Sequence, residues 1–531
     1  MADRHPDQYE VLMKTASPSL YRANAFRVLG LPVNVSMQQL RRREREIAVF
    51  AKMELAPEEI AKQLGGFLPL YPPPDMDMVR EAWQRLQDLE NRIVDEFFWF
   101  WPLSPGLPAE EDEALLLLKQ GDYQGSVAVW RGAAESGGGG VALHNLAVFY
   151  HALALDIEYT GKAVSLSEKQ RHQKESYWKE AYAYWKGAIG TQDLWERLLS
   201  RVKEISDPRL TIETVERVRF TLPLALLSIN GNLAVQAVER GNRAEASLHL
   251  RLIQESGFDN PVIGEALRFT VAREREQIRL LCGSAKDDTE RQPERGAEIA
   301  RQLISQTARP LEVIDTLLPP EHPVREAVHD DVALQILQSQ VAFAKKTDDW
   351  QTSLGLLEEA LATAAGVAAR EQIKENIEIV KNNLRWSVCW FCGENPAEDD
   401  ATLEVKMYGE VTRNLTFRGV RIQWRQVTVR VPRCNTCRSV HQREEVCLAV
   451  GGIAGFALGM GGCIAVEGGG SGFVFFVVSA VLSTAIGWAI GRFSSPKGTK
   501  PETAQAEFPG VLEMKAKGWE IGKRPPEAQG S

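Results

Sequence analysis

The chain has 531 residues, 44% of them hydrophobic and 25% charged, which is typical of globular proteins and long enough for about two to four domains. Its net charge of −9 argues against nucleic-acid binding by the whole chain, although a local basic patch remains compatible with it. Seven cysteines do not make a disulfide framework in a chain of this length, and the polar N-terminus lacks the apolar core of an export signal.

The N-terminal tail, residues 1–20, is polar and contains the tripeptide His5-Pro6-Asp7. Residues 21–104 are predicted to form a helical bundle. A short helix with an apolar face ends at Gly30, and Ser36 is a suitable N-cap for the next helix, which carries four arginines in its first turns. A further helix is expected in the sequence REAWQRLQDLENRIVDEFFWFWP, which begins at Arg80.

This order of elements resembles the J-domain of co-chaperones, in which a short helix, a Leu-Gly turn and a long basic helix precede a third helix. The resemblance implies binding to a heat-shock chaperone through a His-Pro-Asp tripeptide between the second and third helices. At that place this chain has Pro73-Pro74-Asp75, and proline cannot replace the donor and the titratable nitrogen of histidine. We therefore expect a degenerate J-like domain without chaperone stimulation; a generic three-helix bundle is the alternative.

Five consecutive aromatic residues, Phe97 to Trp101, follow the last predicted helix of this bundle. They cannot all lie on one helix face, because consecutive side chains point in different directions. We expect a helix end held between this bundle and the next domain, and an exposed partner site is the alternative.

Residues 105–385 have helical periodicity interrupted by short polar turns, beginning with EEDEALLLLKQGDYQGSVAVWRGAA. Successive helices with a short turn between them resemble the helix pairs of tetratricopeptide repeats, although their spacing is irregular. The resemblance implies a degenerate α-solenoid that binds protein partners. His144 and His151 share one helix face, and we expect them to pack at a helix seam rather than bind a metal. The sequence contains no phosphate-binding loop and no nucleophile elbow, so we expect a protein that is not an enzyme.

The strongest chemical signal lies in residues 386–445, where WSVCWFCGENP and VPRCNTCRSVH each contain a Cys-x-x-Cys pair. Two such pairs can supply four thiolates to a tetrahedral zinc ion, and the segment between them is rich in strand-forming residues. The region resembles a zinc ribbon with structural Zn²⁺; an iron–sulfur cluster, a redox dithiol and unmetallated cysteines are the alternatives. The proposed ligands are Cys389, Cys392, Cys434 and Cys437.

The stretch Arg413–Arg443 contains eight arginines and no acidic residue. Anionic lipid headgroups are the expected partner, nucleic acid is a less favoured one, and some of the arginines are expected to form only a solvated face.

Residues 446–491 contain two uncharged apolar runs, 446–466 and 473–490, joined by EGGGSG. About 20 apolar residues span a bilayer as a helix, so the sequence predicts a two-helix transmembrane hairpin. A hairpin buried inside a soluble protein is the alternative. Basic residues flank both ends of the hairpin, which places both flanks in the cytoplasm. The tail, 492–531, starts as a linker and contains an expected amphipathic turn that lies on the membrane or on the ribbon.

Together these features predict a mainly α-helical scaffold or adaptor at the inner (cell) membrane, which binds protein partners through its J-like and repeat regions. A membrane co-chaperone is the first alternative function, and binding of nucleic acid or anionic lipid by the basic ribbon is the second.

Overall fold

The computed structural model describes residues 10–136, 139–163, 165–416, 419–465 and 498–526, with short helical pieces between 477 and 489. The tripeptide His5-Pro6-Asp7, the turn 467–472 and most of the second apolar run lie outside the described residues. The chain divides into two compact units, Met1–Gly283 with Ile304–Asp331 and Ser284–Leu303 with Val332–Ser531.

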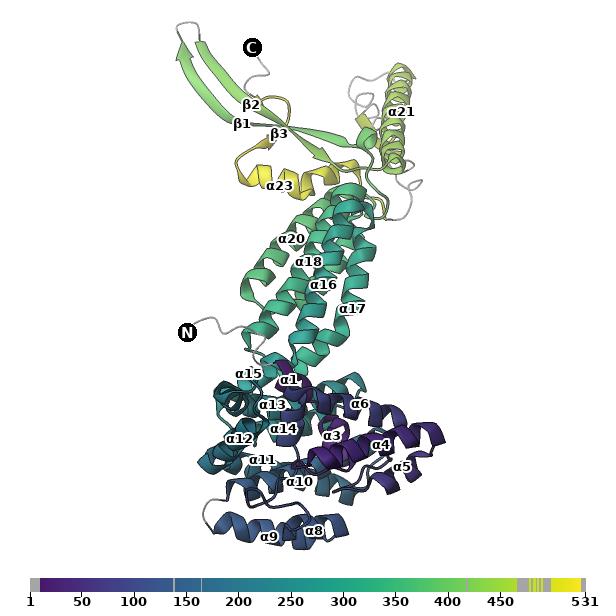
Figure 1. The fold of residues 1–531 in the computed structure, drawn as a ribbon. Helices are drawn as coiled ribbons and strands as arrows, with labels where there is room; N and C mark the ends of the chain where they lie inside the picture. Colours follow the sequence, from purple (N-terminus) through teal and green to yellow (C-terminus); the bar gives the residue numbers. More distant parts are fainter. Residues whose placement is uncertain are drawn as a thin grey trace. The chain divides into compact units, whose positions relative to one another are not determined.

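The described part is mainly helical with one small antiparallel sheet, as the sequence predicts (Figure 1). The chain begins with seven helices: α1 (Glu10–Thr15), α2 (Leu20–Ala23), α3 (Ala25–Leu29), α4 (Met37–Met53), α5 (Pro57–Leu64), α6 (Met76–Gln87) and α7 (Leu89–Phe97). Eight more follow up to residue 270: α8 (Glu113–Gln120), α9 (Tyr123–Glu135), α10 (Gly140–Ala163), α11 (Glu168–Gly190), α12 (Gln192–Ile205), α13 (Ile212–Glu239), α14 (Arg243–Gln254) and α15 (Asn260–Thr270).

The remaining elements begin with a run of helices: α16 (Ala272–Arg291), η2 (Pro293–Arg295), α17 (Gly296–Leu317), α18 (Pro323–Thr347), α19 (Trp350–Thr363) and α20 (Val367–Ser387). The ribbon region follows with η3 (Asp399–Ala401), β1 (Leu403–Thr416), β2 (Gly419–Val431), α21 (Asn435–Ala465), η4 (Glu502–Glu507), α23 (Pro509–Ala516) and β3 (Glu520–Ile521).

Local signals at the start of the bundle are confirmed. Gly30 ends α3 with φ +62°, and a Cβ at this position would lie 2.4 Å from the carbonyl oxygen of Gly65, so glycine is required both by conformation and by close approach. Ser36 and Gln39 form a reciprocal capping box at the start of α4. Asp75, the residue retained from the tripeptide pattern, caps α6 by accepting the backbone N–H of Met78.

The helix expected from Arg80 onward is two helices rather than one. Asp88 leaves the helical conformation and caps α7 with its side chain, which accepts the backbone N–H groups of Glu90 and Asn91. An ion pair of 2.7 Å between Arg85 and the fully buried Asp95 connects α6 to α7 across this break. A side chain that competes for backbone N–H groups thus ends a helix that periodicity alone would continue.

The aromatic run is buried, so the exposed alternative is wrong. Phe97 to Trp101 are each at most 3% exposed. The ring of Phe97 stacks on Trp185 and Trp195, each with a centroid distance of 6.0 Å, and Phe100 stacks on Trp130 at 5.5 Å. These partners lie on α11, α12 and α9, so the run joins the N-terminal bundle to the helices that follow.

One continuous hydrophobic core extends from Leu12 to Ala266. Ion pairs also connect the first helices to later ones, with Arg27 of α3 2.6 Å from Asp156 of α10 and Glu96 of α7 2.7 Å from Arg201 of α12. The helices before and after residue 104, where the sequence suggested a domain boundary, therefore share one core within the first compact unit.

Successive helices pack as pairs, among them α8 with α9, α10 with α11, α13 with α14, and α19 with α20. The predicted helix-pair organisation is confirmed at this level, whereas the resemblance to tetratricopeptide repeats stays a prediction.

Two described helices are long and apolar enough to cross a membrane by length and composition, Gly140–Gly161 of α10 and Ile212–Glu239 of α13. In each, 72% of the apolar window is buried inside the protein, and core burial is sufficient to account for this composition.

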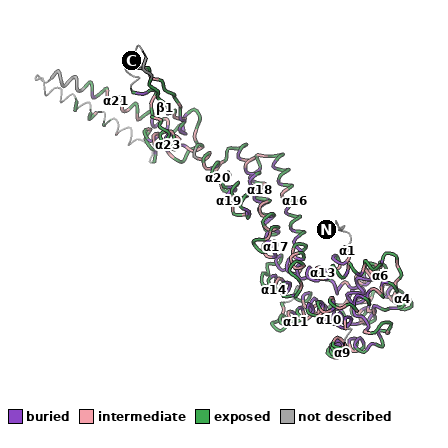
Figure 2. Tube along the Cα trace, turned by 90° about the vertical axis from the view of Figure 1, so that its left-hand side faces the viewer, coloured by how far each residue is buried: buried purple, intermediate pink, exposed green. Residues whose placement is uncertain are grey.

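The sheet has the order β2-β1-β3 and is antiparallel throughout. β1 and β2 form a long hairpin between the two cysteine pairs, in register from Leu403 opposite Val431 to Thr416 opposite Gly419, with an irregularity after Gly409. α21 is a single helix of 31 residues that begins in the ribbon and contains the first apolar run up to Ala465 (Figure 2).

Candidate metal centre

The four predicted metal ligands come together although the inner two, Cys392 and Cys434, are 42 positions apart in the sequence. All four sulfur atoms lie within 4.8 Å of one another, and the sulfurs of Cys392 and Cys434 are 4.0 Å apart. Cys389 and Cys392 follow the end of α20, whereas Cys434 and Cys437 lie at the start of α21. The antiparallel hairpin of β1 and β2 thus brings the second cysteine pair close to the first.

Backbone hydrogen bonds shape the first pair into a turn. Gly393 adopts φ +70° and donates its N–H to the carbonyl of Cys389 at 2.9 Å, as expected for a glycine after a Cys-x-x-Cys pair. The N–H of Cys389 donates to the carbonyl of Asn395 at 2.9 Å. The side chain of Asn395 in turn donates to the sulfur of Cys434 at 3.7 Å, a contact that connects the two pairs.

The second pair uses the start of a helix. The N–H of Cys437 donates to the sulfur of Cys434 at 3.4 Å. Burial alone would raise the pKa of Cys434, but this bond and the one from Asn395 lower it to about 7. Burial raises the pKa of Cys389 and Cys437. A cation that binds here would therefore displace protons from buried thiols.

The four cysteines fit a metal ion that is coordinated by four thiolates. Tetrahedral zinc with Zn–S distances of about 2.3 Å places sulfurs about 3.8 Å apart, close to the spacing of Cys392 and Cys434. Four sulfurs leave no open coordination position, so the ion would close the fold and would not activate water. Iron also accepts a tetrahedral set of four sulfurs, so this donor set fits either ion.

In the sequence His441 lies close enough to the second pair to replace one thiolate, but four cysteines already suffice, and in the structure His441 forms part of the wall of this centre. His441 is 1% exposed, its ring lies edge-on to Phe391 with centroids 4.6 Å apart, and its Nε2 is 3.0 Å from the carbonyl oxygen of Lys500. Its spacing of four residues from Cys437 puts both on one face of α21. His441 supports the centre without belonging to the cysteine cluster.

The predicted basic patch is exposed in part. Five of its arginines are exposed: Arg413, Arg421, Arg425, Arg430 and Arg443. Arg433 is only 8% exposed and donates to the carbonyl of Ala401 at 2.7 Å, so its role is internal. Arg418 lies outside the described residues.

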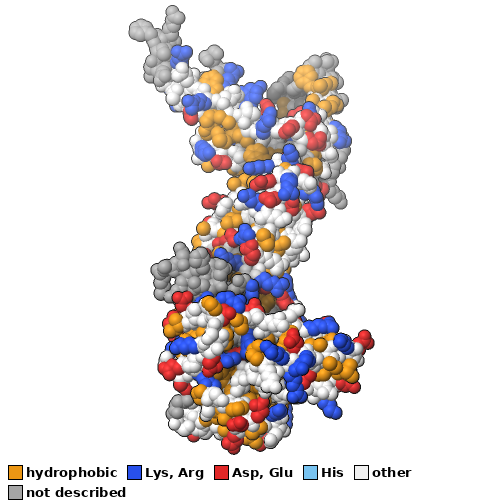
Figure 3. Space-filling model, viewed as in Figure 1, with side chains coloured by type: hydrophobic (Ala, Val, Ile, Leu, Met, Phe, Trp, Pro, Cys, Tyr) orange, Lys and Arg blue, Asp and Glu red, His pale blue; other side chains and the backbone are white. Residues whose placement is uncertain are grey.

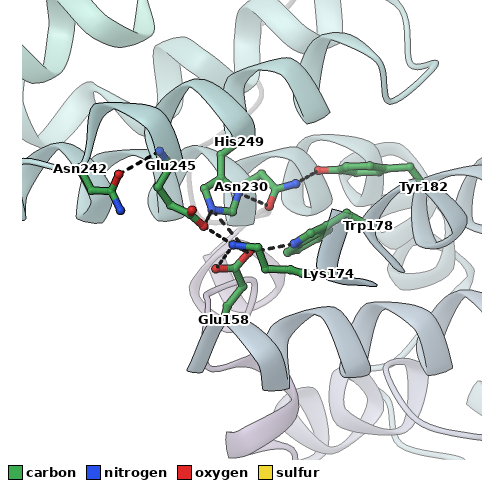
Figure 4. A network of polar contacts seen from close by, with 8 residues as sticks. All are labelled: Glu158, Lys174, Trp178, Tyr182, Asn230, Asn242, Glu245 and His249. Carbon is green, nitrogen blue, oxygen red and sulfur yellow. Dashed lines mark hydrogen bonds and ion pairs between the residues drawn. The ribbon is translucent and has the colours of Figure 1, made fainter. Parts of the chain in front are cut away.

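A second cluster of possible metal ligands, Glu158, Glu245 and His249, lies in the N-terminal unit (Figure 4). Here the ammonium group of Lys174, 1% exposed, contacts both carboxylates, at 3.2 Å from Glu158. Hydrogen bonding from His249 and from Lys174 lowers the pKa of Glu245 to about 2 despite its burial. A side-chain cation thus occupies the place that a metal ion would take.

Three residues complete this buried network. Trp178 donates to Glu158 at 3.1 Å, and Nδ1 of His249 lies 3.2 Å from the amide oxygen of Asn230 (Figure 4). Asn230 also donates to the hydroxyl of Tyr182 at 2.8 Å. With these partners the network is a buried ion-pair cluster that joins α10, α11, α13 and α14.

His144 and His151 pack inside the same unit, as the sequence predicts. His144 is 2.6 Å from the carbonyl oxygen of Phe97, and Nδ1 of His151 accepts a hydrogen bond from the indole of Trp185 at 3.3 Å. Burial lowers the pKa of His144 to about 4 and that of His151 to about 3. Both are therefore neutral core histidines at pH 7.

Comparisons with protein-family models, with curated proteins and with solved structures found no match to this chain. The cysteine cluster, whose residue types and geometry both fit a metal ion, is the functional site that the chain itself identifies.

Proposed function

We propose that this chain is a membrane-anchored scaffold in which a structural zinc centre joins a helical, partner-binding part to a transmembrane hairpin. One observation carries the proposal: α21 contains the metal ligand Cys437 in its first turn and becomes an exposed apolar helix farther along. From Cys437 to Val446 the helix rises about 14 Å, so the metal centre would lie close to a bilayer entered at Val446.

The exposed apolar side chains of α21 support membrane insertion. Val446, Val450, Ile453 and Phe456 are 55–70% exposed, and Figure 3 shows hydrophobic side chains at the surface of this helix. In the second run, the described large side chains are also exposed: Val477, Val478, Val481, Leu482 and Ile486. Contiguous apolar surface of this kind is rare on a protein that meets only water. Basic residues at both flanks favour a cytoplasmic position for both soluble ends, at the inner membrane.

Membrane fractionation of the full chain tests the anchor. The full chain is expected in the membrane fraction, and the triple variant Val450→Asp, Ile453→Asp and Phe456→Asp is expected to shift toward the soluble fraction. The matched control changes Val367 and Ile379 of α20, which are 78% and 56% exposed, to Asp. Equal partitioning of both variants would refute insertion of α21.

A cleft at the start of the chain supports the scaffold role. A cavity of about 360 Å³ lies between α4, the turn after α5 and α8, and its walls include Arg43, Phe67 and Leu116. Leu116 is 37% exposed although it is apolar. Because the cleft is formed jointly by the J-like and repeat regions, a protein partner there would contact both regions that the proposal assigns to binding.

Crosslinking in membranes tests this surface. Leu116→Asp is expected to remove a crosslinked partner, whereas Ile212→Asp, at a residue of the same unit that is 57% exposed, is expected to retain it. Partners lost equally in both variants, or in neither, would place the binding surface elsewhere.

Anionic lipid is a second proposed contact, because the exposed arginines from Arg413 to Arg443 lie next to the apolar part of α21 in the sequence. Binding of the full chain to nucleic acid that weakens steeply with salt, without preference for anionic over neutral vesicles, would favour the nucleic-acid alternative instead.

A further inference from the structure

The chain returns to the metal centre after the apolar segment. We propose that residues 498–526 are a required third part of the metal module, so that the apolar segment 446–491 crosses the bilayer an even number of times and metal retention depends on this return. The inference rests on the proposed function, because it takes residues 446–491 to be embedded in a membrane.

Hydrogen bonds fasten the returning chain to the first cysteine pair. The N–H of Lys500 donates to the carbonyl of Phe391, which lies between Cys389 and Cys392, at 2.8 Å. The indole of Trp390 donates to the carbonyl of Ala504 at 3.0 Å. These residues were expected to form a linker, but Glu502–Glu507 instead form a 3-10 helix against the cysteine turn.

Charged side chains of residues 498–526 also contact the region around the metal centre. The ammonium group of Lys500 lies 3.7 Å from the ring centroid of Trp390, and the carboxylate of Glu502 lies 3.4 Å from the buried guanidinium of Arg433. His441 contacts the carbonyl oxygen of Lys500. The returning chain therefore contacts the polypeptide around both cysteine pairs.

The returning chain also completes the small core. Phe508 is 2% exposed, with its ring centroid 4.9 Å from that of Trp386 and 5.4 Å from that of Trp390. Phe508 and the fully buried Val511 belong to the hydrophobic cluster that contains Cys389, Cys434 and Cys437. The sequence predicts that the C-terminal turn lies either on the membrane or on the ribbon. In the structure it packs on the ribbon.

A third strand, β3, holds the end of residues 498–526 against the sheet. β3 pairs with β1 through Ile521 opposite Met407 and Glu520 opposite Tyr408, and the hydroxyl of Tyr408 donates to the carboxylate of Glu520. The indole of Trp519 covers Gly409, where a Cβ would lie 2.5 Å from the ring. The close approach of Trp519 therefore requires glycine in β1.

These contacts fix the topology. α21 leaves the module at one end of the apolar segment, and residues 498–526 are built into the same module at the other end. A chain that crossed the membrane an odd number of times would hold residues 498–526 on the far side, where none of these contacts can form. The metal centre would then lack part of its core.

The test compares two insertions between Ser494 and Ser495 of the full chain in membranes: an additional transmembrane span of about 20 apolar residues, and a Gly-Ser spacer of the same length. The spacer variant is expected to retain zinc and to protect Cys389 and Cys392 from alkylation. The additional span is expected to abolish both while the chain stays in the membrane. Zinc retention and protection in both variants would overturn the inference, and a parent chain found in the soluble fraction would instead refute the proposed anchor.

Point variants provide an independent measurement in the uninterrupted chain. Phe508→Ala is expected to speed zinc release to a chelator by at least about tenfold, because it opens a cavity in the core that contains the cysteines. Leu512→Ala, in the same helix at a residue that is 48% exposed, is expected to release zinc at the parent rate. Equal release rates for the parent, Phe508→Ala and Leu512→Ala would contradict a role of the returning chain in metal retention.

Discussion

The N-terminal unit buries charged and aromatic side chains in its core, whereas the apolar part of α21 in the second unit exposes a run of large apolar ones. In the first, Glu96 is fully buried between Arg92 and Arg201, and the five residues from Phe97 to Trp101 lie in a core shared by many helices. In the second, a small cluster holds three cysteines together with residues from both ends of the apolar segment. Stability is therefore distributed over many helices in the N-terminal unit, whereas the metal module of the second unit depends on a few contacts.

This contrast predicts the largest effect at the metal centre. Structural zinc contributes about 10–16 kcal/mol to the folding of small metal domains, so Cys434→Ser is expected to unfold the ribbon. The purified parent is expected to bind one zinc ion per chain, and the variant is expected to lose this ion together with hydrogen-exchange protection in β1 and β2.

Cys282→Ser is the matched control, because Cys282 belongs to the other unit and lies outside the cysteine cluster. It is expected to keep both the zinc and the protection. An unchanged ribbon in Cys434→Ser would mean that the thiols hold no structural ion.

A smaller effect is expected from a single buried charge in the N-terminal unit. Glu96→Ala leaves Arg92 and Arg201 without their shared carboxylate, and breaking a buried pair in this way costs about 3–5 kcal/mol. Glu204→Ala removes a 62% exposed partner of the same Arg201 and is expected to cost less than about 1 kcal/mol. Chemical denaturation measures both; equal costs would indicate that the burial of Glu96 is not maintained in solution.

The pH dependence of the N-terminal unit should follow its buried histidines. Burial lowers the pKa of His144 to about 4 and of His151 to about 3. The unfolded histidines titrate near about pH 6.5, so the unfolded state binds more protons below that pH and stability falls as the pH falls. The expected loss between about pH 6.5 and pH 5 is about 2 kcal/mol per histidine.

Denaturation at a series of pH values measures this slope. The double variant His144→Gln and His151→Gln is expected to have a shallower slope, even though it loses hydrogen bonds. A slope equal to that of the parent would assign the pH dependence to other groups.

The smallest predicted effect is at the helix cap Ser36. Ser36→Ala removes the capping box of α4 and is expected to lower the free energy of unfolding by about 1 kcal/mol. Ser247→Ala is the comparison, because Ser247 is exposed inside α14 and caps no helix end. A cost no larger at Ser36 than at Ser247 would argue against the cap.

Features set by neighbouring residues could be predicted from the sequence. Gly30, Ser36 and the two cysteine pairs each carry a signal within four residues, and the structure bears them out. The break at Asp88 was missed because its capping side chain competes with an otherwise regular helical pattern. The pairing of β3 with β1 was missed because a strand of two residues has no periodicity, and its partner lies 112 residues earlier.

Both ends of the apolar segment are proposed to lie on one side of the membrane, in one metal module. Single cysteines introduced at Gln442 and Ala516, both exposed, can be labelled with an impermeant maleimide in sealed membrane vesicles and identified by mass spectrometry. Labelling of both positions from the cytoplasmic face, with Ser471→Cys labelled from the opposite face, is the predicted result. Labelling of positions 442 and 516 from opposite faces would contradict the account.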